Sequence, residues 1–157
     1  MSARVGIGVD AHRLGPGRPL MLATLHIPHD AGLVGHSDGD VVAHALCDAL
    51  LSATGGPDLG ALFPPGDPEW AGAAGARLLT LVRDRIAGEG WRLVNAHAVV
   101  VCERPRLAPH REDMQRALSA ILGAPVTVHA TTTDGMGFTG RGEGIACQAV
   151  ALVEETG

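Results

Sequence analysis

Residues 4–12 read Arg-Val-Gly-Ile-Gly-Val-Asp-Ala-His, and the interpretation of the whole chain starts from this stretch. Its branched apolar residues alternate with glycines, which predicts a β-strand over Arg4–Asp10. Since residues i and i+2 of a strand share a face, Asp10 and His12 project together, on the side opposite the valines and the isoleucine. The strand therefore presents a carboxylate and an imidazole side by side.

The rest of the chain divides by hydrophobic spacing and by glycine or proline breaks. The predicted helices are Asp40–Ala53, Glu69–Ala87 and a segment from Pro109 to Gly123, and the other predicted strands are Pro19–Ile27, Asn95–Glu103, Val126–Thr131 and Ile145–Val153. A loop is expected over Asp58–Pro68. Because strands and helices alternate only in part, we predict one α+β domain over residues 1–157, with a mixed β-sheet covered on one face by helices.

The composition excludes several classes of protein. A hydrophobic fraction of 46% with 18% charged residues argues against a disordered chain. A net charge of −5 and only 3% aromatic residues argue against a nucleic-acid binder. No apolar run is long enough to span a membrane and no N-terminal secretion signal is recognisable, so a cytoplasmic protein is expected. The three cysteines lie in apolar stretches and are expected to be buried free thiols.

A second histidine, His44, lies within the first predicted helix. With Asp10 and His12 it makes an Asp/His/His set, and three protein ligands with one open position are typical of a catalytic zinc. The spacing alone does not place His44 near the strand. The alternatives are an acid/base pair or a shared hydrogen bond for Asp10 and His12, and an ordinary helical residue for His44.

The segment His36-Ser37-Asp38-Gly39-Asp40 leads into the same helix. A helix N-terminus offers free N–H groups and the positive end of the helix dipole, so anions bind there readily, and His36 can donate to a phosphate. An ordinary N-cap by Ser37 or Asp38 is the simpler interpretation of these residues alone.

Residues 130–144 form a glycine-rich stretch with several threonines, one arginine and two carboxylates. Its hydroxyl and N–H groups can hold phosphate oxygens, and Asp134 can hold a hard cation such as Mg²⁺. The stretch is not a P-loop, because the Gly-Lys-Ser/Thr ending is absent. A tight hairpin loop between two strands is the alternative.

Taken in order, these motifs closely resemble the 2-C-methyl-D-erythritol 2,4-cyclodiphosphate synthase family over nearly the whole chain. The strings His-Ser-Asp-Gly-Asp and Gly-Phe-Thr-Gly-Arg-Gly-Glu-Gly carry most of the resemblance, supported by Asp58-Leu59-Gly60 and Phe63-Pro64 between them. The resemblance implies a homotrimer with active sites at the subunit interfaces, in the non-mevalonate pathway of isoprenoid biosynthesis.

The resemblance also implies roles for particular residues. Zinc would be held by Asp10, His12 and His44, and Mg²⁺ or Mn²⁺ through Asp134, while His36 and Thr132 would stabilise the transition state. The implied substrate-binding residues are Ser37, Asp58, Gly60, Phe63, Asp67, Cys102, Pro105, Leu107, Thr131, Thr133, Phe138 and Arg141.

Different parts of the ligand fall to different members of that set. Asp58, Gly60 and the Phe63–Asp67 loop would hold the methylerythritol part, and Cys102–Ala108 with Thr131–Thr133 the cytidine diphosphate. Phe138 and Arg141 would lie near a trimer axis that holds an isoprenoid diphosphate.

The implied reaction converts 4-diphosphocytidyl-2-C-methyl-D-erythritol 2-phosphate to the cyclic 2,4-diphosphate with release of CMP. The 2-phosphate of the substrate is the nucleophile and is mostly ionised at pH 7, so the protein supplies positioning and charge neutralisation. Two alternatives remain on the same residues: a zinc-dependent phosphoesterase with a metal-bound water as nucleophile, and a non-catalytic isoprenoid-phosphate-binding trimer. The chain has no room for a fused second enzyme, so a monofunctional lyase is expected.

The chain departs from the family pattern at three positions. Asp134 stands in place of Glu and is one methylene shorter, so the second cation is expected to bind more loosely or through water. Pro65 replaces an Asp that would contact the methylerythritol hydroxyls. Gln148 replaces a Glu on the trimer axis, which removes a negative charge there.

Overall fold

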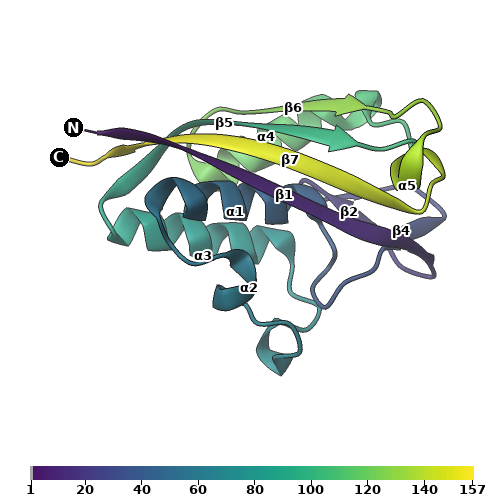
Figure 1. Ribbon diagram of the computed structural model, residues 1–157, viewed down its shortest axis with the longest axis horizontal. Coiled ribbons are helices and arrows are strands. Elements are labelled where there is room, and N and C mark those ends of the chain that lie inside the picture. The colour runs from purple at the N-terminus through teal and green to yellow at the C-terminus, as the bar shows by residue number, and fades with distance from the viewer. Residues whose placement is uncertain (1) are drawn as a thin grey trace.

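The computed structural model describes residues 2–157 (Figure 1). Its elements are β1 (Ala3–Pro16), β2 (Leu20–Leu22), β3 (Leu25–Ile27), β4 (Ala31–Leu33), α1 (Val41–Thr54), α2 (Leu59–Leu62), the 3₁₀ turn η1 (Pro68–Trp70), α3 (Gly75–Gly88), β5 (Trp91–Val101), the 3₁₀ turn η2 (Ala108–His110), α4 (Arg111–Leu122), β6 (Val126–Thr131), α5 (Gly137–Gly140) and β7 (Gly144–Glu155). Within residues 2–157, no helix is long and apolar enough to cross a membrane.

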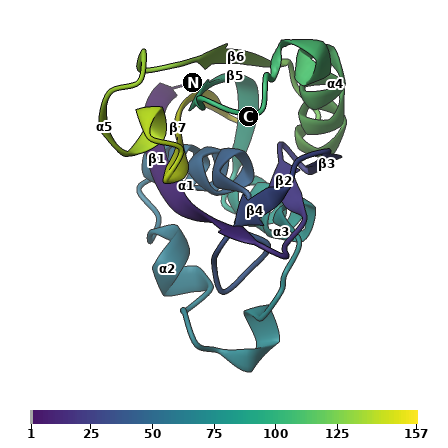
Figure 2. The ribbon, with the colours of Figure 1, turned by 90° about the vertical axis from the view of Figure 1, so that its right-hand side faces the viewer.

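The sheet is mixed and its long helices lie on one face, as the sequence predicts. Its strand order is β4-β1-β7-β5-β6, with β5 and β6 parallel and the other neighbours antiparallel. Helices α1, α3 and α4 stack behind this sheet, and α5 lies at its other side (Figures 1 and 2). The prediction of an α+β fold is therefore confirmed.

In β1 the glycines face the interior of the domain, and the branched apolar residues face outward. Gly6 and Gly8 are buried against α1, whereas Val5, Ile7 and Val9 are 67%, 53% and 64% exposed on the open face of the sheet. A Cβ atom added at Gly6 would lie 2.0 Å from the carbonyl oxygen of Ala49, and one added at Gly8 would lie 2.0 Å from that of Ala45. The glycines thus allow the backbones of β1 and α1 to touch.

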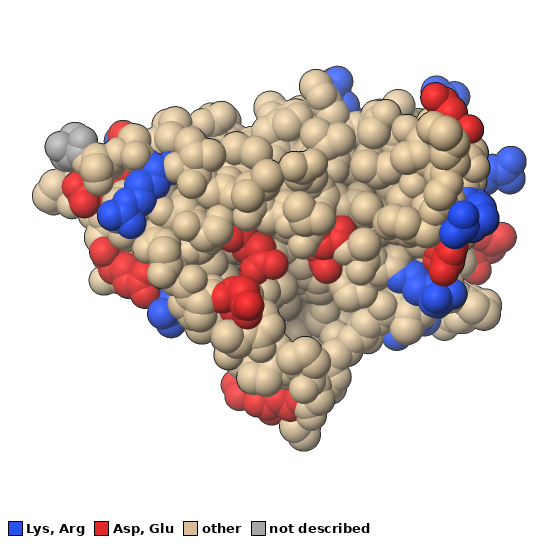
Figure 3. All heavy atoms as spheres, viewed as in Figure 1, with Lys and Arg blue, Asp and Glu red and all other residues tan. Residues whose placement is uncertain are grey.

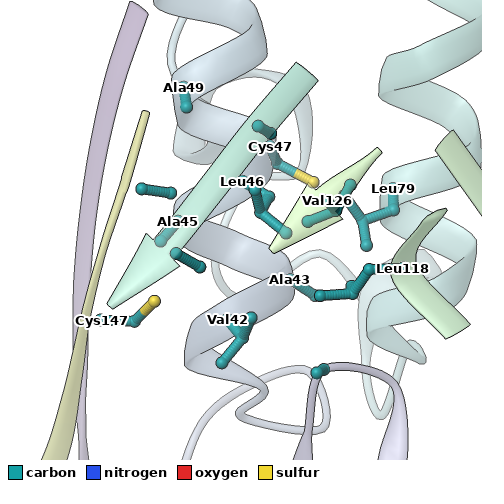
Figure 4. Packing of buried hydrophobic residues seen from close by; sticks show 14 of the residues in the cluster. Val42, Ala43, Ala45, Leu46, Cys47, Ala49, Leu79, Leu118, Val126 and Cys147 are labelled. Atoms are coloured by element: carbon teal, nitrogen blue, oxygen red, sulfur yellow. The ribbon is translucent and has the colours of Figure 1, made fainter. Parts of the chain in front are cut away.

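The core is built from aliphatic side chains of α1, the sheet and the two helices behind α1. Leu46 of α1 packs toward Val126 of β6 and Leu79 of α3, with Leu118 of α4 beside them (Figure 4). Eleven residues of the 14-residue helix α1 are buried, so this helix is the centre of the domain. The three cysteines are free and buried, as predicted.

Asp40 fixes the start of α1. Its fully buried carboxylate accepts hydrogen bonds from four backbone N–H groups, two in the first turn of α1 and two in the turn between β2 and β3. The two residues of that turn, Ala23 and Thr24, have φ values of 54° and 68°, which most residues avoid. Asp40 therefore holds the β2–β3 hairpin against the helix N-terminus.

Several predicted boundaries are wrong. The helix predicted over Glu69–Ala87 is interrupted, because Gly72 takes a φ of 67° and α3 begins only at Gly75. The single strand predicted over Pro19–Ile27 is the hairpin of β2 and β3. The expected loop at Asp58–Pro68 contains α2, and the Asn95–Glu103 strand begins earlier, at Trp91.

The glycine-rich stretch does not join two paired strands. β5 and β7 are neighbours and β6 lies beyond β5, so residues 132–143 cross the end of the sheet from β6 to β7. The tight-hairpin alternative is therefore wrong.

Replacing Gly8 by Ala should lower the free energy of unfolding by about 3 kcal/mol, because the new methyl group meets the backbone of α1. Gly88→Ala is the matched control: Gly88 is the last residue of α3 and an added Cβ there meets nothing within 4 Å. The control should change stability by less than about 1 kcal/mol. Equal losses in urea unfolding of the two variants would show that the contact of β1 with α1 is not tight.

Candidate functional site

The structure brings Asp10, His12 and His44 together. One ligand atom from each lies within 4.8 Å of the other two. The Oδ2 atom of Asp10 is 2.9 Å from Nε2 of His12 and 3.1 Å from Nδ1 of His44. Among residues 2–157 this is the one group of three or more His, Cys, Asp or Glu side chains close enough to share an ion.

The contact of β1 with α1 places these three side chains. Asp10 and His12 lie on the same face of β1 as Gly6 and Gly8, and that face looks at α1. His44 precedes the helix residue that the Gly8 backbone touches, Ala45, and its side chain is only 6% exposed. Asp10 and His12 therefore point toward α1 because side chains alternate along the strand, and the strand–helix contact places His44 beside them.

Each imidazole is oriented by its second nitrogen. Nδ1 of His12 lies 2.9 Å from the carbonyl oxygen of Val34, and Nε2 of His44 lies 3.0 Å from the hydroxyl oxygen of Ser37. When these outer nitrogens carry the protons, the inner nitrogens offer their lone pairs toward Asp10. This is the outer arrangement expected of histidines that ligate a metal.

The ionisation of Asp10 suits a cation. Burial raises the pKa of Asp10, but hydrogen bonds and charge from His12 and His44 outweigh burial and leave the pKa below its ordinary value. The hydrogen bond with Asp10 raises the pKa of His12, against the opposing effect of burial. Asp10 is therefore a carboxylate at neutral pH, and the site combines one negative charge with two imidazole nitrogens.

A cavity of about 260 Å³ opens beside the triad. Its walls are the triad, His36, Ser37, Leu59, Gly60, Phe63, Pro65, Trp70 and Leu78. The molecular surface is hollowed between β1 and the protruding segment that carries α2 and η1, with acidic side chains beside the hollow (Figure 3). The cavity thus has a polar end at the triad and an apolar wall opposite.

The apolar wall is tied to the polar end by short contacts. Nε2 of His36 lies 2.7 Å from the carbonyl oxygen of Asp67, and the N–H of Gly72 donates to the carbonyl oxygen of His36 at 2.8 Å. Asp38 accepts from the N–H of Gly75 at 2.8 Å. These bonds explain why α3 starts at Gly75, and they hold the 64–75 segment against the triad.

The sequence interpretation missed three residues of this wall. Trp70, Leu59 and Leu78 line the cavity, and Trp70 packs edge-on against Phe63 with 4.6 Å between ring centres. The guanidinium of Arg77 covers the Trp70 ring at 4.7 Å. The sequence pattern predicts a continuous helix through Trp70, and the signal that points away from it is Gly72, whose φ of 67° ends any helix at that position.

The other residues expected near the methylerythritol part lie around the cavity in different ways. Phe63 and Gly60 line it, whereas Asp58 is exposed and caps α2 by accepting from the N–H of Ala61. The Asp67 side chain caps η1, and its carbonyl group meets His36. Pro65 stands in the wall, so that position adds apolar surface instead of a carboxylate.

The residues expected to hold cytidine diphosphate lie elsewhere in the chain. Cys102, Pro105 and Leu107 follow β5, Thr131 ends β6 and residues 132–134 come after it; none of them lines the triad cavity. The register runs from Ala11 of β1 through Ala146 and Val101 to Thr131, three strand spacings or roughly 14 Å across the sheet. Within one chain, the triad therefore lies two strands from the residues after β5 and three strands from the end of β6.

Polar side chains gather where β6 ends. Asp134 is exposed with a φ of 53°, and the hydroxyl of Thr132 donates to its carboxylate at 3.4 Å. The hydroxyls of Thr133 and Thr139 are 2.8 Å apart. Burial raises the pKa of Cys102 to about 11, so its thiol is protonated at neutral pH.

Phe138 and Arg141 lie on the crossing segment. Phe138 is 42% exposed in α5, and the guanidinium of Arg141 lies 3.1 Å from the carboxylate of Glu143. Gln148 is exposed on the open face of the sheet, between Val9 of β1 and Val99 of β5.

An α+β domain with a carboxylate and two oriented imidazoles beside an open cavity is the framework of a metal-assisted enzyme. The chain belongs to the YgbB family, whose profile matches residues 3–154. The 2-C-methyl-D-erythritol 2,4-cyclodiphosphate synthase of Cutibacterium acnes is 56% identical over 151 residues, covering 96% of this chain and 90% of the relative.

Solved structures agree with this assignment. One, described as 2C-methyl-D-erythritol-2,4-cyclodiphosphate synthase in a CDP-bound form, superposes with a TM-score of 0.88 at 38% identity and covers 96% of this chain and 100% of its own. The bifunctional IspDF of Campylobacter jejuni superposes with a TM-score of 0.94 at 36% identity over 98% of this chain. This chain spans 42% of the length of that bifunctional protein.

His44→Ala should abolish stoichiometric metal binding, because it removes one of three ligands. Ser37→Ala should weaken the affinity by about ten- to a hundredfold, because it frees the outer nitrogen of His44. Metal content after equilibration with zinc and gel filtration, and competition with a chromophoric chelator, measure both effects.

His26→Ala is the control, because His26 is exposed on β3 and lies outside the triad. It should bind metal like the parent protein. Full metal content in the His44→Ala variant would contradict the ligand assignment.

Proposed function

We propose that this chain converts 4-diphosphocytidyl-2-C-methyl-D-erythritol 2-phosphate to 2-C-methyl-D-erythritol 2,4-cyclodiphosphate and CMP. The observation that carries the proposal is the Asp10–His12–His44 triad, whose imidazoles are oriented by Val34 and Ser37. The triad forms the polar end of a cavity whose opposite wall is apolar, which suits a ligand with phosphate groups and a carbon chain. Membership of the family and the names of its close relatives support the same activity.

The reaction needs no strong base from the protein. The substrate's 2-phosphate attacks the β-phosphorus, and the bond from that phosphorus to the bridging oxygen of CMP breaks. The 2-phosphate is already an anion at neutral pH, so catalysis consists of bringing it into line and of stabilising the charge that develops on the β-phosphate.

The residues of this chain divide that work. His36 stands at the rim of the cavity with its ring nitrogen bonded to the Asp67 carbonyl, so its orientation is fixed before a phosphate arrives. We assign it to the transferring phosphate, together with Thr132. Ser37, Gly60 and Phe63 position the methylerythritol part against the apolar wall of Pro65 and Trp70.

The triad fits zinc. One carboxylate and two imidazole nitrogens match the three protein ligands of a catalytic zinc, and their outer hydrogen bonds match as well. When bound there, zinc would polarise the β-phosphate and leave a position for one of its oxygens. Asp134, with the hydroxyl of Thr132 beside it, would hold Mg²⁺ or Mn²⁺.

The cytidine diphosphate is assigned to the far edge of the sheet. Backbone groups of Cys102–Leu107 and the hydroxyls of Thr131 and Thr133 would hold it, and the CDP-bound form of a similar protein supports a cytidine nucleotide as ligand. The triad lies at β1 and the nucleotide set near the ends of β5 and β6, so we infer that β6 of one chain approaches β1 of another and brings one triad close to a neighbour's nucleotide set. A head-to-tail contact that closes a ring does this.

The open face of the sheet supports a closed homotrimer. Val5, Ile7, Val9 and Val150 are all more than 40% exposed there, and the surface over β1, β7 and β5 is almost free of charged side chains (Figure 3). Burying such a face between subunits removes apolar surface from water. Gln148, Phe138 and Arg141 would then surround the axis, where an isoprenoid diphosphate would bind.

Incubation of the purified chain with substrate and Mg²⁺ should give the cyclic diphosphate and CMP, identified by ³¹P NMR and mass spectrometry. Linear phosphate products would favour the zinc-dependent phosphoesterase. Binding of isoprenoid diphosphate without turnover would favour the non-catalytic trimer. Asp134→Ala should lower kcat by about a hundredfold while the triad keeps its zinc, because it removes charge stabilisation alone.

Ile7→Glu should convert the trimer to monomers in size-exclusion chromatography with light scattering, because it puts a charge in the apolar contact. The variant should lose CDP binding and keep one zinc per chain. Leu81→Glu is the control, since Leu81 is 39% exposed on α3, away from the open face. An Ile7→Glu variant that stays trimeric would contradict this contact surface.

A further inference from the structure

Polar side chains recur at every fourth position of α1, a helix whose other residues are almost all apolar. They are Asp40 at the N-cap, His44, Asp48 and Ser52. Residues four apart lie one above the other on a helix, so these side chains form one stripe. Asp40 bonds the β2–β3 turn and His44 belongs to the triad, whereas Asp48 lies outside both.

Asp48 joins α1 to α2. Its Oδ1 atom accepts a hydrogen bond of 2.8 Å from the N–H of Leu59, the first residue of α2. Among residues 2–157, this is the one hydrogen bond that connects residues 57–63 with the rest of the chain. No residue of α2 is buried, and Leu59, Leu62 and Phe63 pack only partly against the core. The position of α2 therefore depends strongly on this bond.

α1 is a rigid support for the bond. Eleven of its 14 residues are buried, and it carries His44 one turn before Asp48. Four residues of an α-helix span about 6 Å along its axis. One helix thus holds a ligand of the triad and, one turn further, the anchor of α2, so helix geometry sets the spacing between them.

The anchored N–H group lies in the middle of the wall assigned to the methylerythritol part. Leu59 stands between Asp58 and Gly60, and both Leu59 and Gly60 line the triad cavity. Phe63 follows α2, and its N–H donates to the carbonyl oxygen of Leu59 at 2.9 Å. A shift of Leu59 would therefore move Asp58, Gly60 and Phe63 with it.

The carboxylate of Asp48 keeps this place against an electrostatic penalty. Burial raises the pKa of Asp48 above its ordinary value, the charges of Asp58 and Asp10 add to the rise, and the Leu59 N–H offsets it only in part. Within residues 2–157, that N–H is the one hydrogen-bond donor to the carboxylate. A carboxylate near two others repels a phosphate, so holding the Leu59 N–H is the role that its contacts support.

We propose that Asp48 is a positioning residue for the methylerythritol part of the substrate. It accepts the Leu59 N–H and so holds Asp58, Gly60 and Phe63 beside the triad before the substrate binds. A wall that is ordered in advance spares the ligand the loss of entropy on ordering it. This role rests on the proposed function, because it concerns the substrate of that reaction.

Asp48→Ala removes the acceptor, whereas Asp48→Asn keeps an oxygen in its place. In the alanine variant the substrate must order α2, so KM should rise about tenfold while kcat stays within about threefold of the parent value. The asparagine variant should have a KM within about threefold of the parent value. Both variants should keep one zinc per chain and the parent's affinity for CDP, because neither change touches the triad or the nucleotide set.

A second measurement does not depend on turnover. The bond to Asp48 protects the Leu59 amide hydrogen from exchange with solvent. In zinc-loaded protein followed by ¹⁵N NMR, this hydrogen should exchange about tenfold faster in Asp48→Ala and close to the parent rate in Asp48→Asn.

Ser52→Ala is the matched control within the stripe. Ser52 lies one turn beyond Asp48, and its hydroxyl bonds the backbone N–H and carbonyl groups of Ile7 in β1, not α2. Asp113→Ala controls for the loss of a carboxylate, since Asp113 is exposed on α4 and pairs with Arg116 of the same helix. KM and the exchange of the Leu59 amide should be unchanged in both variants.

The role of Asp48 is overturned if KM or the Leu59 exchange rate of Asp48→Ala equals that of the parent, or if Asp48→Asn is impaired as strongly as Asp48→Ala. Loss of zinc from Asp48→Ala would overturn it too, because the defect would then lie in α1 and the triad. A parent protein that forms no cyclic diphosphate, with Leu59 exchange still faster in Asp48→Ala, would reject the proposed function and keep Asp48 as the anchor of the wall.

Discussion

The direct contact of β1 with α1 is the constraint on which the rest of this structure depends. Two glycines let the strand backbone touch the helix backbone, and no residue with a Cβ fits at either position without displacing α1. This contact carries the strand's polar end, Asp10 and His12, to the helix residue His44. It also turns the branched residues of β1 outward, which leaves an apolar face open to solvent in the single chain.

Hydrogen bonds to backbone groups then hold the start of α1, the cavity wall and the triad histidines in place. Asp40 ties the start of α1 to the β2–β3 turn, and Asp38 and His36 tie the cavity wall to the segment that leads into α1. Val34 and Ser37 take the outer nitrogens of the triad histidines. The site is thus supported by backbone carbonyls, hydroxyls and buried carboxylates, which accounts for an enzyme framework with so few aromatic residues. Where a metal completes the triad, local charge rather than the net charge of −5 meets an anionic substrate.

The proposed site is divided between two edges of one sheet. The triad and its cavity lie at β1, whereas the residues that follow β5 lie two strands away and residues 131–134, at the end of β6, lie three strands away. The glycine-rich segment starts there and runs back to β1, where the N–H of Leu14 donates to the carbonyl oxygen of Glu143. A flexible loop cannot close that gap, because residues 131–144 are held by their own hydrogen bonds and by α5. Assembly of chains is the physical way to unite the two sets, and the exposed valines and isoleucine of the open face provide surface for it.

The sequence by itself determined the α+β class and the core residues of α1, because hydrophobic periodicity is a local property. It offered Asp10, His12 and His44 only as one candidate set among alternatives, and the resemblance to a known family, not the spacing, made that set the preferred one. The helix predicted over residues 69–87 is wrong, because the N–H of Gly72 donates to His36 and the N–H of Gly75 donates to Asp38, and both acceptors lie far away in the sequence. The position of Trp70 in the cavity wall could not be predicted either, because it depends on where that helix begins. Only the tertiary structure decided that His44 faces Asp10, that the valines of β1 point outward, and that Asp48 meets Leu59, because each of these depends on which segments pack side by side.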